Sequence, residues 1–292
     1  MSRLNGHNAT AHSEVLPRFE FGANWRRFLS VLTDERIAHA EASLCAMLDR
    51  SSLTGRRFLD IGCGSGLFSL AARRLGAEVY SFDFDPLAVA CAEELKRAYF
   101  PRDDAWRIFR GSVLDADYMR SLGTFDIVYS WGVLHHTGSM WTAVDRAAHA
   151  VAMGGELFIA LYNDQGPQSV RWARVKRTYN QLPRALRPAY MLVFGVALEA
   201  AALGVSLVRL QPRRFIERWT NYENVRGMSR WHDVVDWIGG YPFQVASPEA
   251  VVDFCRARGF SLLRLKTCGR KMGCNEFVFE RGRSGPSHRW PA

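Results

Sequence analysis

An apolar strand that runs directly into a glycine-rich turn constrains this chain more than any other feature. The strand, residues 58–61, is followed by Gly62-Cys63-Gly64-Ser65-Gly66, and a helical pattern begins at Leu67. Glycines at such a turn let the backbone bend sharply and approach a ligand closely, while the N–H groups of the helix point at it. The turn therefore predicts a site for a nucleotide-like ligand in an α/β sheet.

Two acids and one leucine narrow the choice of ligand. A dinucleotide-binding turn has glycine at its sixth position, and this chain has Leu67 there. Asp60 stands two residues before the first glycine, where its charge would repel a pyrophosphate. The same charge suits a positive ammonium and sulfonium, both of which S-adenosylmethionine (SAM) carries. Asp83 ends the second strand, where an acid can accept hydrogen bonds from both ribose hydroxyls.

The spacing Asp60-x-Gly62-x-Gly64-x-Gly66, with Asp83 closing the second strand, resembles the class I SAM-dependent methyltransferases. More broadly, the pattern is similar to the small-molecule methyltransferases of ubiquinone biosynthesis, and this resemblance covers residues 58–161. It implies SAM as the cofactor and a doubly wound, mostly parallel, seven-stranded Rossmann-like α/β sheet. A SAM-binding protein without catalysis is disfavoured, because the glycine turn and its two acids are intact.

The apolar periodicity alternates between strands and helices as such a sheet requires. Strands are expected over residues 57–61, 78–82, 106–110, 125–129 and 156–161, and helices over 34–48, 67–75, 86–99, 117–122 and 140–152. A final helix after Ser247-Pro248 and strands over 260–266 and 275–280 complete the sheet. The predicted parts are an N-terminal helical lid (1–54), the SAM-binding core (55–162), a helical insertion (163–243), the remainder of the core (244–282) and a disordered tail (283–292).

Ligands of open α/β sheets bind outside the carboxyl ends of the strands, so the residues at those ends are the candidate site. The expected cofactor-binding residues beyond the glycines and the two acids are Cys63, Phe84, Ser112, Val113, Ser130 and Trp131. Ser112 stands where the family usually has an acid near the adenine, so the backbone of Val113 is the alternative contact.

Catalysis is expected from the polar residues that follow strands four and five. His136 is favoured over His135 as a general base, because histidine titrates near the pH at which a hydroxyl or amine must lose its proton. The alternative is that the two histidines only hold their loop, and as neighbours they are expected to face different sides. Asn163 and Asp164 are further catalytic candidates, and Tyr162 is a candidate for substrate binding. No spacing of acids and histidines predicts a metal.

The insertion carries the charge of the chain. Residues 165–230 hold twelve Lys and Arg against three Glu, a difference of nine that equals the net charge of the whole protein. Within it, residues 188–208 carry one charge, Glu199, and have arginines on both sides. That length suits a membrane span, yet a single span would separate the last strands from their sheet. The remaining interpretations are a helix in the membrane interface, a re-entrant hairpin or a buried cap helix over the active site.

An aromatic-rich run after this helix is expected to line the acceptor pocket. Trp231, His232 and Tyr241 are the candidates for substrate contact, and Arg226, Arg230 and His232 for an anionic or oxygenated headgroup. The alternative is that these aromatics only attach the insertion to the sheet.

These features favour methyl transfer to a small lipophilic or aromatic acceptor, with oxygen as the target atom, and contact of the insertion with a membrane surface. The alternative function is methylation of RNA or another nucleic acid, which the basic charge of the insertion favours. Against it, Ser130-Trp131-Gly132-Val133 lacks the proline pair of amino-methylating nucleic-acid enzymes. Six cysteines without a C-x-x-C pair and a polar N-terminus favour the cytoplasm.

Overall fold

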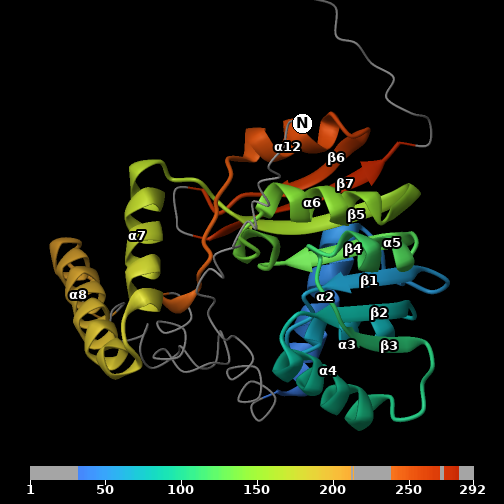
Figure 1. Ribbon diagram of the computed structural model, residues 1–292, viewed down its shortest axis with the longest axis horizontal. Helices are drawn as coiled ribbons and strands as arrows, with labels where there is room; N and C mark the ends of the chain where they lie inside the picture. Colours follow the sequence, from blue (N-terminus) through green and yellow to red (C-terminus); the bar gives the residue numbers. More distant parts are fainter. Residues whose placement is uncertain (1–31, 212, 214–237, 270–272, 283–292) are drawn as a thin grey trace, which may run out of the picture.

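The computed structural model describes residues 32–211, 213, 238–269 and 273–282 (Figure 1). The strands are β1 (Arg57–Ile61), β2 (Glu78–Asp83), β3 (Trp106–Arg110), β4 (Phe125–Trp131), β5 (Val151–Tyr162), β6 (Phe260–Lys266) and β7 (Cys274–Arg281). The helices are α2 (Asp34–Leu48), α3 (Leu67–Arg74), α4 (Pro86–Tyr99), α5 (Ala116–Ser121), η1 (Leu134–His136), α6 (Met140–His149), α7 (Pro167–Gln181), η2 (Arg184–Leu186), α8 (Arg187–Val208) and α12 (Pro248–Arg256).

The seven strands form one sheet in the order β3-β2-β1-β4-β5-β7-β6. The first five strands pair in parallel, whereas β7 runs antiparallel to both β5 and β6. The predicted seven-stranded, mostly parallel, doubly wound sheet is therefore confirmed. The strand order reverses between β1 and β4, and the glycine turn follows β1 at this switch point, where ligands of such sheets bind.

Two hydrophobic layers enclose the sheet, because successive side chains of a buried strand point to opposite faces. Phe58 packs with α2 and α3 in one layer, and Leu59 packs with α6 and α12 in the other. The same alternation in β5 sends Phe158 to the first layer and Ile159 to the second. Both faces of the sheet are thus covered, which leaves the carboxyl ends of the strands as the place for a site.

Three boundaries in this part of the chain were predicted wrongly. The helix expected over residues 140–152 ends at His149, and β5 begins at Val151, five residues before the expected start. The cause is that Val151 pairs with Phe125 across a register shift at the start of β4, so backbone pairing overrides the local helical pattern. Strand β4 also extends beyond its expected end, to Trp131.

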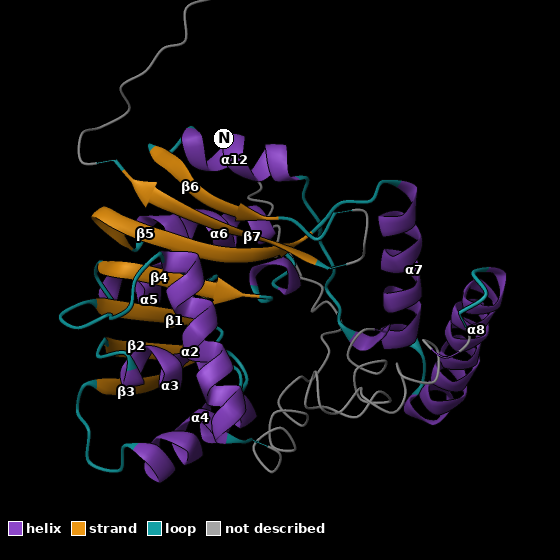
Figure 2. Ribbon diagram, turned by 180° about the vertical axis from the view of Figure 1, so that it is seen from behind, coloured by secondary structure: helices purple, strands orange, loops and turns teal. Residues whose placement is uncertain are grey.

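The insertion leaves and rejoins the sheet at one point. Asn163 forms an isolated bridge with Ala246, and the Ala246 N–H donates to the Tyr162 carbonyl at 3.0 Å. Helices α7 and α8 stand beyond the carboxyl ends of the strands, with α8 on the side of α7 that faces away from the sheet (Figures 1 and 2). The predicted helix over 188–208 is confirmed as α8, and it does not lie buried against the sheet.

Helix α8 exposes most of its apolar surface. The helical stretch Arg184–Val208 is, among the described residues, the one long and apolar enough to cross a membrane, and only 12% of its most apolar part is buried. Met191 is buried, in a small cluster with Tyr179 of α7 and Ile238. The exposed apolar side chains on this helix include Leu192, Val193, Val196, Val205, Leu207 and Val208.

Candidate functional site

The glycine turn between β1 and α3 needs glycine for two separate reasons. Gly62, Gly64 and Gly66 have φ angles of 76°, 54° and 82°, in the left-handed region that other residues avoid. A Cβ on Gly66 would also lie 2.9 Å from the Cβ of Ala92 in α4, and one on Gly62 would lie 2.4 Å from Val133. The turn therefore packs closely against α4 on one side and against the segment that follows β4 on the other.

Asp60 lies beneath this turn in a buried polar network. Its carboxylate accepts a hydrogen bond of 2.5 Å from Ser69 of α3, and the Ser69 hydroxyl lies 2.7 Å from that of Ser81 in β2. The indole N–H of Trp106 donates to Ser81 at 3.0 Å. Burial raises the pKa of Asp60 to about 7, the Ser69 hydrogen bond lowers it, and the charge of Asp83 raises it again.

Asp83 connects the turn to the end of β2. One carboxylate oxygen accepts from the Gly64 N–H at 3.0 Å, and the other accepts from the Asp85 N–H at 2.9 Å. Asp60 is buried and Asp83 half-buried, so two acids surround one turn at different depths. The charge of Asp83, together with that of Asp60 when it is ionised, fits a cationic ligand and opposes a pyrophosphate.

The other residues expected to contact the cofactor lie at or just beyond the carboxyl ends of β2, β3 and β4. Phe84 and Trp131 are exposed, whereas Ser130 is buried and donates to the Ile61 carbonyl at 2.9 Å. Ser112 accepts from the Leu114 N–H at 3.1 Å, and Val113 is buried with its carbonyl 3.4 Å from Arg146 Nη1. These contacts leave Phe84 and Trp131 as the exposed apolar surfaces of the candidate cofactor site.

Cys63, within the turn, is not set up for nucleophilic chemistry. Burial raises the pKa of its thiol well above the ordinary value, and the charges of Asp60 and Asp83 raise it further. The thiol therefore stays protonated, and Cys63 contributes backbone and volume to the turn.

The two predicted histidines lie together in η1, directly after β4. Their ring centroids are 4.5 Å apart, and both rings pack on Tyr162 at the end of β5, with centroid distances of 4.0 Å for His135 and 5.4 Å for His136. The expectation that they face different sides is wrong. They belong to a 3-10 turn rather than to a strand, so neighbouring side chains are not opposed.

Hydrogen bonds assign different protons to the two rings. Nδ1 of His136 lies 2.7 Å from the Pro242 carbonyl, which can only accept, so this nitrogen carries the proton and Nε2 carries the lone pair. Nδ1 of His135 accepts from the Tyr162 N–H at 3.3 Å, so the proton of this ring is on Nε2. Burial lowers the pKa of His135 well below its ordinary value, and protonation of His136 and the charge of Lys176 lower it further.

Asn163 and Asp164 make hydrogen bonds that hold the start of the insertion in this structure. The side-chain amide of Asn163 donates to the Gly269 carbonyl at 3.2 Å, and its side-chain oxygen accepts from the Asn275 amide at 3.0 Å. Asp164 is exposed, and its carboxylate accepts from the Gly166 N–H at 2.8 Å just before α7. Their catalytic role stays a prediction, and the contacts observed are those of a loop anchor.

The acceptor side of the site is described in part. The rings of Tyr162 and Phe243 pack together with their centroids 5.2 Å apart. Tyr241, two residues before Phe243 in the sequence, is half-buried. Trp231, His232, Arg226 and Arg230 lie outside the described residues. Sequence reasoning missed Lys176 of α7, whose side chain is fully buried with its Nζ 5.0 Å from the centre of the Phe243 ring. Only its place on the inner face of α7 could have distinguished it from its exposed arginine neighbours.

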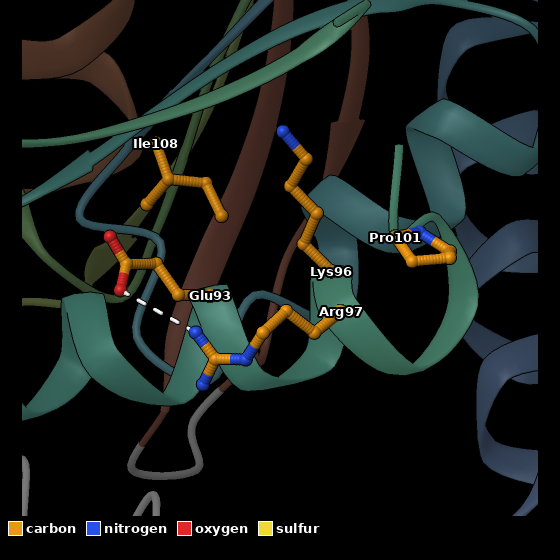
Figure 3. A pocket seen from close by; sticks show the side chains of 5 residues that line it. All are labelled: Glu93, Lys96, Arg97, Pro101 and Ile108. Carbon is orange, nitrogen blue, oxygen red and sulfur yellow. Dashed lines mark ion pairs between the residues drawn. The ribbon is translucent and has the colours of Figure 1, made fainter. Parts of the chain in front are cut away.

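A separate cavity of about 240 Å³ lies between α4 and β3 (Figure 3). It is lined by Glu93, Lys96, Arg97, Pro101 and Ile108, and a 4.0 Å ion pair joins Glu93 to Arg97. Glu93, Lys96 and Arg97 belong to the later turns of α4, Pro101 follows the end of this helix, and Ile108 is in the middle of β3. Within the described ranges, no group of three His, Cys, Asp or Glu side chains is arranged to hold a metal ion.

The strand order, the glycine turn and the two acids define an α/β fold of the class I SAM-dependent methyltransferase type. Within this class, residues 59–157 match the family described as a methyltransferase domain, so this part of the chain is a methyltransferase domain. A solved magnesium protoporphyrin IX methyltransferase from Synechocystis PCC 6803, with bound S-adenosylhomocysteine (SAH), has the same fold. Its TM-score is 0.53 at 14% identity, covering 89% of this chain and 95% of that one.

Two curated relatives extend the comparison. A ubiquinone biosynthesis O-methyltransferase from Xylella fastidiosa is 32% identical over 114 residues, which are 39% of this chain and 45% of the relative. A tRNA U34 carboxymethyltransferase from an Enterobacter species is 27% identical over 203 residues, which are 66% of this chain and 60% of the relative. The chain thus spans less than two thirds of either relative's length.

Proposed function

We propose that the whole chain is a SAM-dependent methyltransferase for a small acceptor. The observation that carries this proposal is the pair of acids at the glycine turn. Asp83 holds the turn through Gly64, and buried Asp60 would add a second negative charge below it when it is ionised. A cationic nucleoside fits such a turn, and the relatives of residues 59–157 are methyltransferases.

The described residues suggest how the cofactor would be held. Asp83 would accept from its ribose hydroxyls, and Asp60 would compensate its positive charge through the turn. Phe84 and Trp131 offer exposed apolar surface beside it. When bound, SAM would supply a methyl group on a sulfonium, whose neutral thioether is the leaving group of an in-line displacement.

The proposed target atom is a hydroxyl oxygen, because His136 is arranged to receive a proton. Its Nδ1–H is held by the Pro242 carbonyl, which leaves the lone pair of Nε2 as the basic end of the ring. The hydroxyl oxygen would take the methyl group of SAM, which would leave as the neutral thioether SAH, and His136 would receive the hydroxyl proton. Tyr162 and Phe243 supply aromatic walls, which fit an aromatic or lipophilic acceptor.

A second part of the proposal is that α8 rests on a membrane surface. β5 precedes this helix and β7 follows it in one sheet, so α8 cannot cross a bilayer once and leave the fold intact. Its exposed valines and leucines, with exposed Arg184 and Arg209 near its two ends, match a helix lying in the interface. Such a position would favour lipophilic acceptors.

Vesicle flotation tests the membrane contact. The protein should float with anionic vesicles and less with neutral ones, and salt should weaken the binding. Val196→Glu, at a side chain 60% exposed, should abolish flotation without unfolding the protein. Val170→Glu, at an exposed valine of α7, is the matched control. Equal flotation of wild type and Val196→Glu would exclude α8 as the contact.

Incubation with SAM labelled in its methyl group tests the activity itself. The label should enter a solvent-extractable metabolite fraction of a cell extract and should be absent with Asp83→Ala. Purified total RNA serves as the second acceptor, because of the tRNA-modifying relative and the exposed arginines Arg171, Arg174 and Arg177 of α7. Nuclease-sensitive label would favour the nucleic-acid alternative, and no label in either fraction would contradict catalysis.

A further inference from the structure

The histidine turn η1 and the insertion helix α7 meet in one buried cluster next to the glycine turn. Val133, two residues before His135, is the side chain that a Cβ on Gly62 would strike. His135 and His136 pack on Tyr162, Tyr162 packs on Phe243, and Lys176 stands 5.0 Å from the Phe243 ring centre. The cluster therefore joins the cofactor turn to the acceptor side of the site.

His135 contributes a buried hydrogen-bond donor to this cluster. The ring is fully buried, and its Nδ1 accepts from the backbone of Tyr162, so Nε2 carries the proton. Among the described residues, Nε2 has no hydrogen-bond partner. Buried donors without an acceptor are rare in native proteins, and each one points to a missing partner. An oxygen of a bound ligand would satisfy it.

Lys176 contributes positive charge to the same place. Its side chain is fully buried on α7, and its charge reaches His135, whose pKa it lowers. Whatever else the ammonium contacts, its charge acts on the ring that carries the unsatisfied donor. A buried positive charge beside a buried N–H favours an acceptor oxygen that is itself negative.

Resting on the proposed function, we propose that His135 and Lys176 bind a carboxylate of the methyl acceptor. The Nε2–H of His135 donates to one carboxylate oxygen, and the ammonium of Lys176 supplies the counter-charge. His136 is thereby left to take the proton of the hydroxyl that is methylated. The acceptor is then an aromatic or otherwise apolar hydroxy acid, oriented by its acid end, with Tyr162 and Phe243 along its body.

Two pairs of probes that differ in charge and little in shape test the site. Calorimetry on the protein saturated with SAH compares benzoate with benzamide and acetate with acetamide. At least one acid should bind ten-fold or more tightly than its amide. This preference should disappear in Lys176→Met, be largely retained in Lys176→Arg, and fall several-fold in His135→Phe, which keeps the ring packing. Lys96→Met, in the cavity between α4 and β3, is the matched control and should leave the preference unchanged.

Each result bears on the proposal separately from the cofactor assignment. If the protein binds SAH but prefers neither acid, the carboxylate site is refuted and the methyltransferase proposal stands. A preference that survives in Lys176→Met and His135→Phe refutes it equally, since another group then holds the acid. If Lys176→Met fails to bind SAH because it misfolds, His135→Phe alone decides. Failure of the wild type to bind SAH contradicts the proposed function itself.

Discussion

Replacing Asp60 by asparagine should make the unliganded protein more stable at alkaline pH while it weakens SAM binding. The carboxylate is 2% exposed and lies in a network with Ser69, Ser81 and Trp106. An asparagine side chain can still accept the Ser69 hydrogen bond, so the change removes charge and keeps shape. What it abolishes is the free-energy cost of ionising a buried acid.

The magnitude follows from the pKa of Asp60, which burial raises from 3.8 to about 7. Between these two values the folded state holds the proton and the unfolded state does not. The stability contributed by protonated Asp60 is complete below the lower value and is lost as the pH rises through the higher one. From pH 5 to pH 8, the wild type should lose roughly 2–3 kcal/mol of unfolding free energy relative to Asp60→Asn.

Urea unfolding of both proteins without ligand at pH 5, 6, 7 and 8, followed by circular dichroism, measures this difference. Groups that titrate identically in the two proteins cancel when their unfolding free energies are subtracted. Ser69→Ala is a useful companion, because it removes the hydrogen bond that lowers the pKa of Asp60 and should shift the transition to higher pH. A difference that does not change with pH, or that favours the wild type as the pH rises, would refute the reasoning.

Three further predictions follow from the site. Gly66→Ala should destabilise the fold by about 1–3 kcal/mol, because its φ is 82° and the new Cβ meets Ala92. Gly55→Ala, with a φ of 74° but open space around it, should cost less, and equal costs in chemical unfolding would contradict the clash. His136→Gln should lower labelled methyl transfer about 10²–10⁴-fold with SAH affinity unchanged, and unaltered turnover would exclude it as the base. SAM binding near pH 6.5 should release a proton from Asp60, seen in calorimetry with two buffers of different ionisation enthalpy, and no buffer dependence would argue against this coupling.

The sheet could be predicted from sequence because its signals are local. An apolar run such as β1, a glycine turn and an acid at the end of β2 each lie within a few residues. The predicted boundaries were wrong where pairing with another strand determines them. Val151 is an example, because it belongs to β5 through its pairing with Phe125 of β4. Periodicity shows which residues are apolar, but it does not show which strand they will pair with.

The location of the site could be predicted from the sequence, but the protonation and burial of its side chains could not. Its positions follow from the carboxyl ends of the strands, yet the protons on His135 and His136 depend on carbonyl and N–H groups from Pro242 and Tyr162. The burial of Lys176 depends on how α7 packs, because in the sequence it is one cation among twelve in the insertion. The sequence likewise could not decide whether α8 is exposed, since an apolar helix suits a protein core and a membrane interface equally well.

Calorimetric titration of the protein with SAM, SAH and NAD tests the central claim most directly. The two acids at the glycine turn predict that SAM and SAH bind and that NAD, with its pyrophosphate, does not. Asp83→Ala should weaken SAM by about 1.5–3 kcal/mol for each charge-assisted hydrogen bond lost. Binding of NAD without binding of SAM would contradict the account.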